Sequence, residues 1–280
     1  MEARTRDGAR LSVEAIGAPG DPAILLIAGA AASMDLWDDE LCARLADGGR
    51  RVIRYDHRDT GRSTTYPAGA PPYSGTDLAQ DAIAVLDALG IARAHLVGIS
   101  MGGGLAQELA FTHRERLLTL TLMATTAIDF EREDLPGMSE ALRAALADPR
   151  PEPDWDDRHA AVAYLVENER PFASARDFDE LRARSRAERI YDRSLEPASA
   201  ANHWAIGGEG PAPGDVSRLH DVPTLVLHGT EDPFFPLEHG RSLAARIPGA
   251  RLIELDGVGH EPPPPRTWDV VVPALLRHTA

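Results

Sequence analysis

The segment HLVGISMGGGLAQELA, residues 95–110, places a glycine-flanked serine between an apolar run and a helical pattern. Gly98-Ile99-Ser100-Met101-Gly102 has the form G-x-S-x-G, which marks an exposed serine when a strand precedes it and a helix follows. A glycine inside a helix costs roughly 1 kcal/mol relative to alanine, so the run Gly102–Gly104 needs a steric reason. We expect these glycines to let strand and helix approach closely, which favours Ser100 as a nucleophile over a flexible loop.

The composition excludes several classes of function. The chain has 280 residues, 43% of them hydrophobic, which is enough for one large core or two small domains. Its net charge of −15 argues against nucleic acid or an anionic membrane as a partner, because both require a basic surface. All 29 basic residues are arginines, which excludes a Schiff-base lysine, a P-loop lysine and a Ser-Lys dyad. We therefore expect a small-molecule substrate, no cofactor and no metal.

Other features bear on where the chain works. Cys42 is the only cysteine, so an internal disulfide or a cysteine metal cluster is excluded. No stretch of eighteen uncharged apolar residues is present, which argues against a membrane span. The charged residues 1–7 lead into no apolar signal-peptide core. These patterns predict a cytoplasmic protein and leave a homo-oligomer possible.

Strand and helix patterns alternate over the first half of the chain, which is typical of a parallel sheet covered by helices on both faces. Six strands are predicted, two short ones within residues 4–16 joined by a turn at Asp7-Gly8, then Ala23–Ala28, Arg51–Tyr55, Ala94–Ile99 and Leu117–Met123. The intervening helices are expected at Leu36–Leu45, Leu78–Leu89 and Leu105–Phe111.

The alternation stops after Ile128 and resumes near residue 216. Residues 128–215 are polar, helix-prone and rich in proline, and they contain no buried-strand run. Strand and helix patterns then return in order at Pro223–His228, Leu237–Arg246, Arg251–Leu255 and Trp268–Arg277. We expect one α/β core, residues 1–127 and 216–280, with a helical lid, residues 128–215, inserted after the sixth strand. This lid is expected to wall and cover the site and so to govern the choice of substrate, while the chemistry stays with the catalytic groups on the sheet.

A serine hydroxyl needs a base that takes its proton and an acid that orients the base. In this fold order the acid and the histidine follow the serine, each after a later strand. Asp232 lies in the loop after Pro223–His228, and His260 lies in a glycine-bracketed loop after Arg251–Leu255. Glu231 and Asp256 are rival candidates for the acid.

Ester cleavage also requires N–H donors for the developing oxyanion. One predicted donor is the backbone N–H of Met101, next to the nucleophile. The other is the N–H of Ala30, just past the turn at Gly29 that follows the strand Ala23–Ala28.

These segments resemble the α/β-hydrolase fold family over nearly the whole chain. VIRYDHRDTGRSTT at residues 52–65 and LIAGA at residues 26–30 are most similar to the aclacinomycin methylesterase group, which removes the methyl ester from anthracycline polyketides. The resemblance implies that the catalytic triad consists of Ser100, Asp232 and His260. It implies that the oxyanion hole is formed by Ala30 and Met101. Within the first stretch, we expect Asp56, Arg58 and Asp59 to shape the turn after their strand.

The leading hypothesis is therefore a serine hydrolase that cleaves a carboxylic ester through an acyl-enzyme, and the resemblance implies a methyl ester of an aromatic polyketide. Lactone hydrolysis and cofactor-free perhydrolysis use the same triad and stay open as alternatives. A ligand-binding signalling protein of this fold is a third alternative. Trp155, His203 and Trp204 of the lid are candidates to line a pocket for an aromatic substrate, although such residues more often hold a lid to its core.

Overall fold

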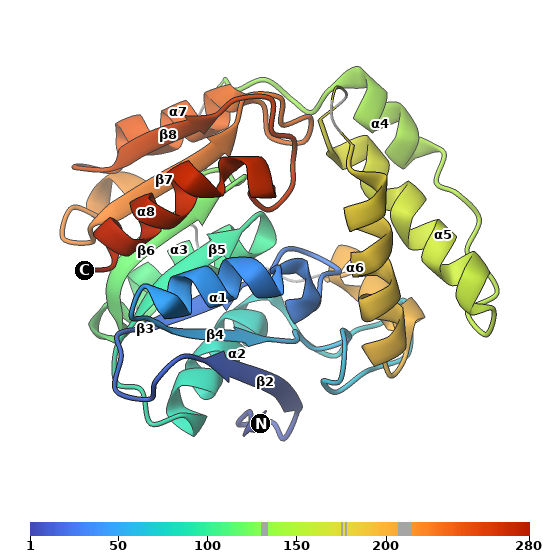
Figure 1. Ribbon diagram of the computed structural model, residues 1–280, viewed down its shortest axis with the longest axis horizontal. Coiled ribbons are helices and arrows are strands. Elements are labelled where there is room, and N and C mark those ends of the chain that lie inside the picture. The colour runs from blue at the N-terminus through green and yellow to red at the C-terminus, as the bar shows by residue number, and fades with distance from the viewer. Residues whose placement is uncertain (130–133, 175, 177, 207–213) are drawn as a thin grey trace.

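The computed structural model describes residues 1–129, 134–174, 176, 178–206 and 214–280; parts of the predicted lid therefore lie outside the described residues. The strands of these ranges are β1 (Glu2–Arg4), β2 (Arg10–Ile16), β3 (Ala23–Ile27), β4 (Arg51–Tyr55), β5 (Ala94–Ile99), β6 (Leu117–Met123), β7 (Thr224–Gly229) and β8 (Arg251–Leu255). They form one sheet in the order β1-β2-β4-β3-β5-β6-β7-β8 (Figure 1). β1 and β2 pair antiparallel with their neighbours, and the pairs from β4 to β8 are parallel. The predicted α/β architecture is confirmed.

Helices cover both faces of this sheet (Figure 1). One face packs against α1 (Asp39–Asp47) and α8 (Trp268–His278), and the other packs against α2 (Gly75–Ala88), α3 (Met101–Thr112) and α7 (Leu237–Arg246). All residues of β3 and β5 are buried, as expected for parallel strands whose apolar runs are covered on both sides. Single-turn 3-10 helices lie at Met34–Leu36 (η1), Arg114–Arg116 (η2), Val216–Arg218 (η6) and Pro265–Thr267 (η7).

The helix α3 begins at Met101, four residues before the apolar pattern that starts at Leu105, in keeping with the expectation that the glycine run lies at the start of a helix. The three glycines therefore lie in its first turn. A Cβ on Gly98 would be 2.2 Å from the Gly102 carbonyl oxygen, and one on Gly102 would be 2.3 Å from the Ile27 oxygen. A Cβ on Gly103 would be 2.7 Å from the Thr125 methyl carbon, whereas one on Gly104 would meet nothing nearer than 4.0 Å. Close packing thus requires glycine at positions 98, 102 and 103, whereas the expectation that Gly104 also permits close packing is wrong.

The segment between β6 and β7, residues 128–215, is called the cap below. Its described residues form helices and loops: α4 (Glu140–Ala147), α5 (Arg158–Glu169), η4 (Arg170–Phe172), α6 (Glu180–Arg193) and η5 (Pro197–Trp204). In Figure 1 they stand beside the sheet at the end where the parallel strands finish. Val162, Val166, Ala183 and Ala187 form a small apolar cluster that joins α5 to α6. Within the described ranges, no helix combines the length and the apolar character that crossing a membrane requires.

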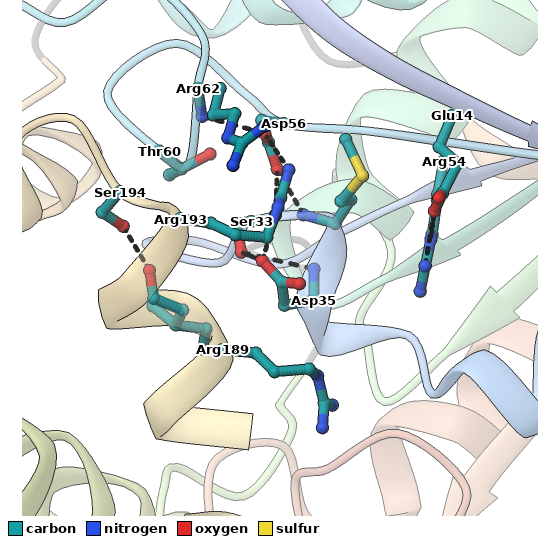
Figure 2. Close-up of polar contacts among 12 residues, drawn as sticks. Glu14, Ser33, Asp35, Arg54, Asp56, Thr60, Arg62, Arg189, Arg193 and Ser194 are labelled. Atoms are coloured by element: carbon teal, nitrogen blue, oxygen red, sulfur yellow. Dashed lines mark hydrogen bonds and ion pairs between the residues drawn. The ribbon is translucent and has the colours of Figure 1, made fainter. Parts of the chain in front are cut away.

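Ion pairs attach the cap helix α6 to the core. Figure 2 shows Arg193 of α6 reaching Asp35, in η1 after β3, and Asp56, directly after β4. The Arg193 Nη2 to Asp56 Oδ2 distance is 2.8 Å, and Asp56 is fully buried. Ser33 donates to the Asp35 carboxylate at 2.8 Å. Removal of Arg193 would leave a buried carboxylate without its counter-charge, so we infer that this contact holds α6 firmly against the core.

Candidate active site

Ser100 lies in the tight turn between β5 and α3. Its backbone has φ 54° and ψ −120°, a conformation that non-glycine residues rarely adopt and that is found mostly at functional sites. Serine is a favoured N-cap residue, yet the Ser100 hydroxyl makes no capping bond to α3. Backbone bonds hold the turn, because the Ser100 N–H donates to the Met123 oxygen at 3.0 Å and its carbonyl accepts from Thr125 Oγ1 at 2.9 Å. The hydroxyl is thereby left for another partner.

That partner is His260, whose Nε2 lies 2.9 Å from the Ser100 Oγ. On the other side of the ring, the His260 Nδ1 lies 2.9 Å from Asp232 Oδ2. Asp232 is buried, and its Oδ1 accepts from the backbone N–H groups of Phe234 and Phe235 at 2.9 and 2.8 Å. The carboxylate is therefore fixed in orientation and presents Oδ2 to the imidazole. The structure brings together the three residues that the sequence pattern selected.

The rival acids are placed elsewhere. Glu231 accepts from the Ser174 hydroxyl at 2.6 Å and pairs with Arg176 at 2.7 Å, so its carboxylate faces the cap. Asp256 is exposed. Of the three carboxylates considered, only that of Asp232 is hydrogen-bonded to His260.

The loops that carry Asp232 and His260 are joined to each other. The N–H of Glu231 donates to the Val258 oxygen at 3.0 Å, and that of Gly257 donates to Thr230 Oγ1 at 2.9 Å. Gly229 permits this contact, since a Cβ there would lie 2.2 Å from the Val258 oxygen. The acid and the histidine are thus held as one unit.

The cap also contacts the loop of the histidine. The backbone N–H of His260 donates to the carbonyl oxygen of Phe172, in η4, at 2.7 Å. The ring centroids of Phe172, Phe234 and Phe235 lie 6.0, 5.0 and 5.6 Å from that of His260. The aromatic rings surround the imidazole, and the His260 side chain is 10% exposed. The sequence patterns did not single out Phe172, Phe234 or Phe235. The stretch PFF at residues 233–235, directly after Asp232, was a local signal for the last two.

The loop after β3 approaches the serine from the other side. A Cβ on Gly29 would lie 3.4 Å from the Ser100 Cβ, and Gly29, Ala30 and Ala31 all line the same cavity as Ser100. Met101 is the first residue of α3, so its N–H is at the positive end of the helix dipole. Both predicted oxyanion donors, Ala30 and Met101, therefore lie next to the serine.

A cavity of about 370 Å³ opens above Ser100 and His260. Core loops and the cap form its walls together. Apolar and aromatic side chains dominate them: Leu36, Ile99, Trp155, Tyr164, Leu165, Phe172, Trp204 and Phe234, with Glu152, Asn168 and Glu169 as the polar members. Trp155 and Trp204 line it as the sequence suggested. His203 does not line it; its ring is buried and hydrogen-bonded on both nitrogens to backbone groups.

The stretch after β4 shapes its own turn, as predicted. Asp56 accepts from the N–H groups of Met34 and Arg62, at 2.9 and 3.0 Å. Arg58 is buried against the carboxylate of Asp81 at 2.7 Å, and Asp59 accepts from the Tyr73 hydroxyl at 2.5 Å. Burial raises the pKa of Asp56, and the Arg193 guanidinium and backbone donors oppose that rise. None of the three side chains lines the cavity.

The fold and this arrangement of serine, histidine and aspartate define a hydrolase class, and the comparison with known sequences agrees. The sequence profile of the alpha/beta hydrolase fold matches residues 22–264. The chain therefore belongs to the α/β hydrolase fold family.

Two relatives narrow this class. The chain is 35% identical to the rhodomycin D methylesterase DauP of Streptomyces sp. (strain C5), over 92% of this chain and 91% of that protein. It is 34% identical to the rhodomycin D methylesterase DnrP of Streptomyces peucetius over the same shares. The resemblance to anthracycline methylesterases is thereby confirmed. In fold, the chain matches the esterase RhEst1 from Rhodococcus sp. ECU1013 with a TM-score of 0.78, at 22% identity, over 100% of this chain and 99% of that one.

Proposed function

We propose that this chain is a serine esterase that cleaves a carboxylic ester through an acyl-enzyme, and that its substrate is a methyl ester of an aromatic polyketide. The observation that carries the proposal is the continuous contact from Asp232 through His260 to Ser100, with 2.9 Å at each step, at the floor of the cavity. The two methylesterases that resemble the chain over nine-tenths of its length support the choice of ester. In this proposal residues 1–127 and 216–280 form the catalytic core, and residues 128–215 form the cap.

The geometry supports the following steps. His260 Nε2 takes the Ser100 proton as Oγ bonds to the ester carbonyl carbon, and Asp232 stabilises the resulting imidazolium through Nδ1. The carbonyl oxygen, now anionic, accepts from the N–H groups of Ala30 and Met101, each worth about 3–4 kcal/mol in the transition state. His260 then protonates the departing alkoxide as the ester C–O bond breaks, so the alcohol leaves and the acyl group stays on Ser100. Water, deprotonated by His260, hydrolyses this acyl-enzyme to the carboxylic acid and regenerates the serine.

The walls of the cavity support an aromatic acyl group. Trp155 and Tyr164 make an edge-to-face contact, with ring centroids 5.5 Å apart, and Trp204, which is 61% exposed, lines the same cavity. Aromatic side chains in such positions bind flat rings by stacking and edge contacts. The volume of about 370 Å³ lies within the range of small-molecule sites, which is roughly 300–1,000 Å³. None of the described lining residues is an arginine, so an uncharged ester suits the cavity.

The proposal is tested by incubating the protein with an anthracycline-type methyl ester and, separately, with simple methyl esters and lactones, and by following the released acid by liquid chromatography. We expect the aromatic methyl ester to be hydrolysed with the highest kcat/KM. Ser100→Ala should abolish turnover at an unchanged thermal unfolding midpoint. Equal turnover by the variant, or a folded protein that hydrolyses none of these compounds, would refute the proposal.

A further inference from the structure

His203 of η5 connects the cap to the loop that carries the proposed oxyanion donor. Its Nδ1 accepts a hydrogen bond from the backbone N–H of Ala31 at 2.8 Å. Its Nε2 lies 2.8 Å from the carbonyl oxygen of Arg58, to which only a protonated nitrogen can donate. The pair of contacts therefore defines one tautomer, neutral imidazole with its proton on Nε2. Burial lowers the pKa of His203, which keeps this neutral form.

The loop that His203 contacts is a tight turn with a strained residue. The N–H of Ala32 donates to the Gly29 oxygen at 3.4 Å, and Ala31, the third residue of this turn, has φ +57°. A positive φ at that position is the feature of a type II turn, where glycine is the usual residue. An alanine held there costs on the order of 1–3 kcal/mol and persists only if the surroundings compensate. Rotation of the peptide between Ala30 and Ala31 would relieve the strain.

The hydrogen bond that the Ala31 N–H donates to His203 opposes that rotation. If the peptide turned over, the partly buried Ala31 N–H would lose its acceptor, and leaving it unsatisfied costs up to about 1–3 kcal/mol. His57 secures the start of the same loop, because its Nε2 lies 3.1 Å from the Ala28 carbonyl oxygen. The rings of His57 and His203 meet edge to face with centroids 5.7 Å apart. Two neutral imidazoles thus fix the loop on either side of Gly29 and Ala30, one from the core and one from the cap.

We propose that His203 is a positioning residue for catalysis: through Ala31 it anchors the turn whose first peptide carries the Ala30 N–H, and so fixes the place at which this donor meets the substrate oxyanion. The inference rests on the proposed function. It also gives the cap a part in the chemistry, since a contact from η5 completes the oxyanion site. His203 does not line the substrate cavity, although its partner Ala31 does, so we expect substitutions of His203 to change kcat more than KM.

Two substitutions separate the two contacts of His203, the one in which Nδ1 accepts from Ala31 and the one in which Nε2 donates to the Arg58 oxygen. In His203→Asn, the amide oxygen occupies the place of Nδ1, since both atoms are bonded to Cγ, and the contact to the Arg58 oxygen is lost. In His203→Gln, the amide nitrogen occupies the place of Nε2, so the hydrogen bond to the Arg58 oxygen is kept and the acceptor for Ala31 is lost. Ser199→Ala is the matched control, because Ser199 is a buried residue of η5 that donates to the Tyr66 oxygen at 2.9 Å and makes no contact with the turn.

The readouts are kcat and KM for p-nitrophenyl acetate and the affinity for a phenyl trifluoromethyl ketone, whose hemiketal oxygen occupies the oxyanion site. Loss of one oxyanion donor lowers kcat by about 10²–10³-fold, so a misaligned one should lower it by about 10–100-fold. We expect this loss for His203→Gln, with KM within about twofold and the inhibitor affinity weakened by the same factor as kcat/KM. His203→Asn should retain kcat within about threefold, and Ser199→Ala should match the parent.

A His203→Gln variant that keeps the parent's kcat would overturn the inference. A His203→Asn variant whose kcat is as low as that of His203→Gln would also overturn it. If His203→Gln does not fold, His203→Asn decides alone, since a folded variant that keeps the acceptor but loses tenfold or more in kcat contradicts the role. Failure of the proposed function is recognised separately. In that case the parent protein neither hydrolyses p-nitrophenyl acetate nor is labelled at Ser100 by a fluorophosphonate.

Discussion

Replacement of Gly102 by alanine tests how the turn at Ser100 is built. A methyl group at Gly102 would lie 2.3 Å from the Ile27 oxygen and 2.5 Å from the Ala28 oxygen. Both atoms are backbone, so neither can swing aside as the end of a flexible side chain would. Restoring ordinary contact requires β3 and α3 to separate by about 1 Å at this point. Because Ala28 leads directly into Gly29 and Ala30, the separation also moves the oxyanion loop.

The size of the effect follows from these contacts. Overpacking of a well-packed site lowers the free energy of unfolding by about 1–3 kcal/mol. A misplacement of about 1 Å at the reacting groups lowers the rate by about 10²-fold. Gly104→Ala is the matched control, since the nearest atom to its added methyl is the Ile128 Cγ2 at 4.0 Å. There the helix propensity of alanine should raise the unfolding free energy by about 0.5–1 kcal/mol.

The measurements are urea denaturation for stability and kcat/KM for a simple ester. We expect Gly102→Ala to lose both stability and activity, and Gly104→Ala to gain stability with unchanged activity. If Gly102→Ala retained the parent's activity and unfolding midpoint, the steric reason given for the glycine run would be wrong.

Three further predictions concern the acid, the buried histidine and the cavity wall. Asp232→Asn should lower kcat by about 10⁴-fold, because its Oδ1 is held by two backbone N–H groups and the amide nitrogen must then face His260; Glu231→Gln should change kcat less than about threefold. In urea titrations, the parent protein should lose stability as the pH falls from about 6 to 4, because burial lowers the His57 pKa to about 3. In His57→Phe this loss should be smaller by about 1.4 kcal/mol per pH unit. Trp204→Ala should raise KM for a bulky aromatic ester about fivefold and leave a small ester unaffected.

The sign of the His57 prediction follows from the two states. The unfolded chain binds a proton on this imidazole near pH 6.5, and the native state excludes the proton until about pH 3. The native stabilisation is therefore complete above about pH 6.5 and is lost as the pH falls. An unchanged slope in His57→Phe would contradict the burial argument. For the other two, Glu231→Gln slower than Asp232→Asn, or an unchanged KM in Trp204→Ala, would contradict the assignments.

Much of the fold was predictable because its signals are local. The strands β5, β6 and β8 and the helix α7 have the bounds that their apolar patterns indicated, and turn residues delimit them. Ser100, Asp232 and His260 were also accessible, since each follows a strand and parallel strands finish at one edge of the sheet. The apolar pattern alone places the start of this helix at Leu105, because glycine propensity argues against helix; the start at Met101 follows from the G-x-S-x-G context and from tertiary packing.

The contacts between cap and core could not be predicted. His203 and Ala31 are separated by 172 positions, and the hydrogen bond between them depends on how η5 docks. Neither residue carries a motif, and a lone histidine beside Trp204 suggested a substrate contact instead. The carbonyl of Phe172 that holds the His260 backbone is likewise invisible in sequence, because any residue type provides a carbonyl. Such contacts are specified by the assembled fold alone.

The most direct test of the central claim is the site at which a fluorophosphonate probe modifies the protein, located by mass spectrometry of its peptides. The contact of Ser100 with His260 at 2.9 Å predicts one adduct, on the peptide that contains Ser100. The same treatment of Ser100→Ala or His260→Ala should give no adduct, or labelling slowed by several orders of magnitude. An adduct on a different serine, or equal labelling of Ser100→Ala, would contradict the claim that Ser100 is the nucleophile.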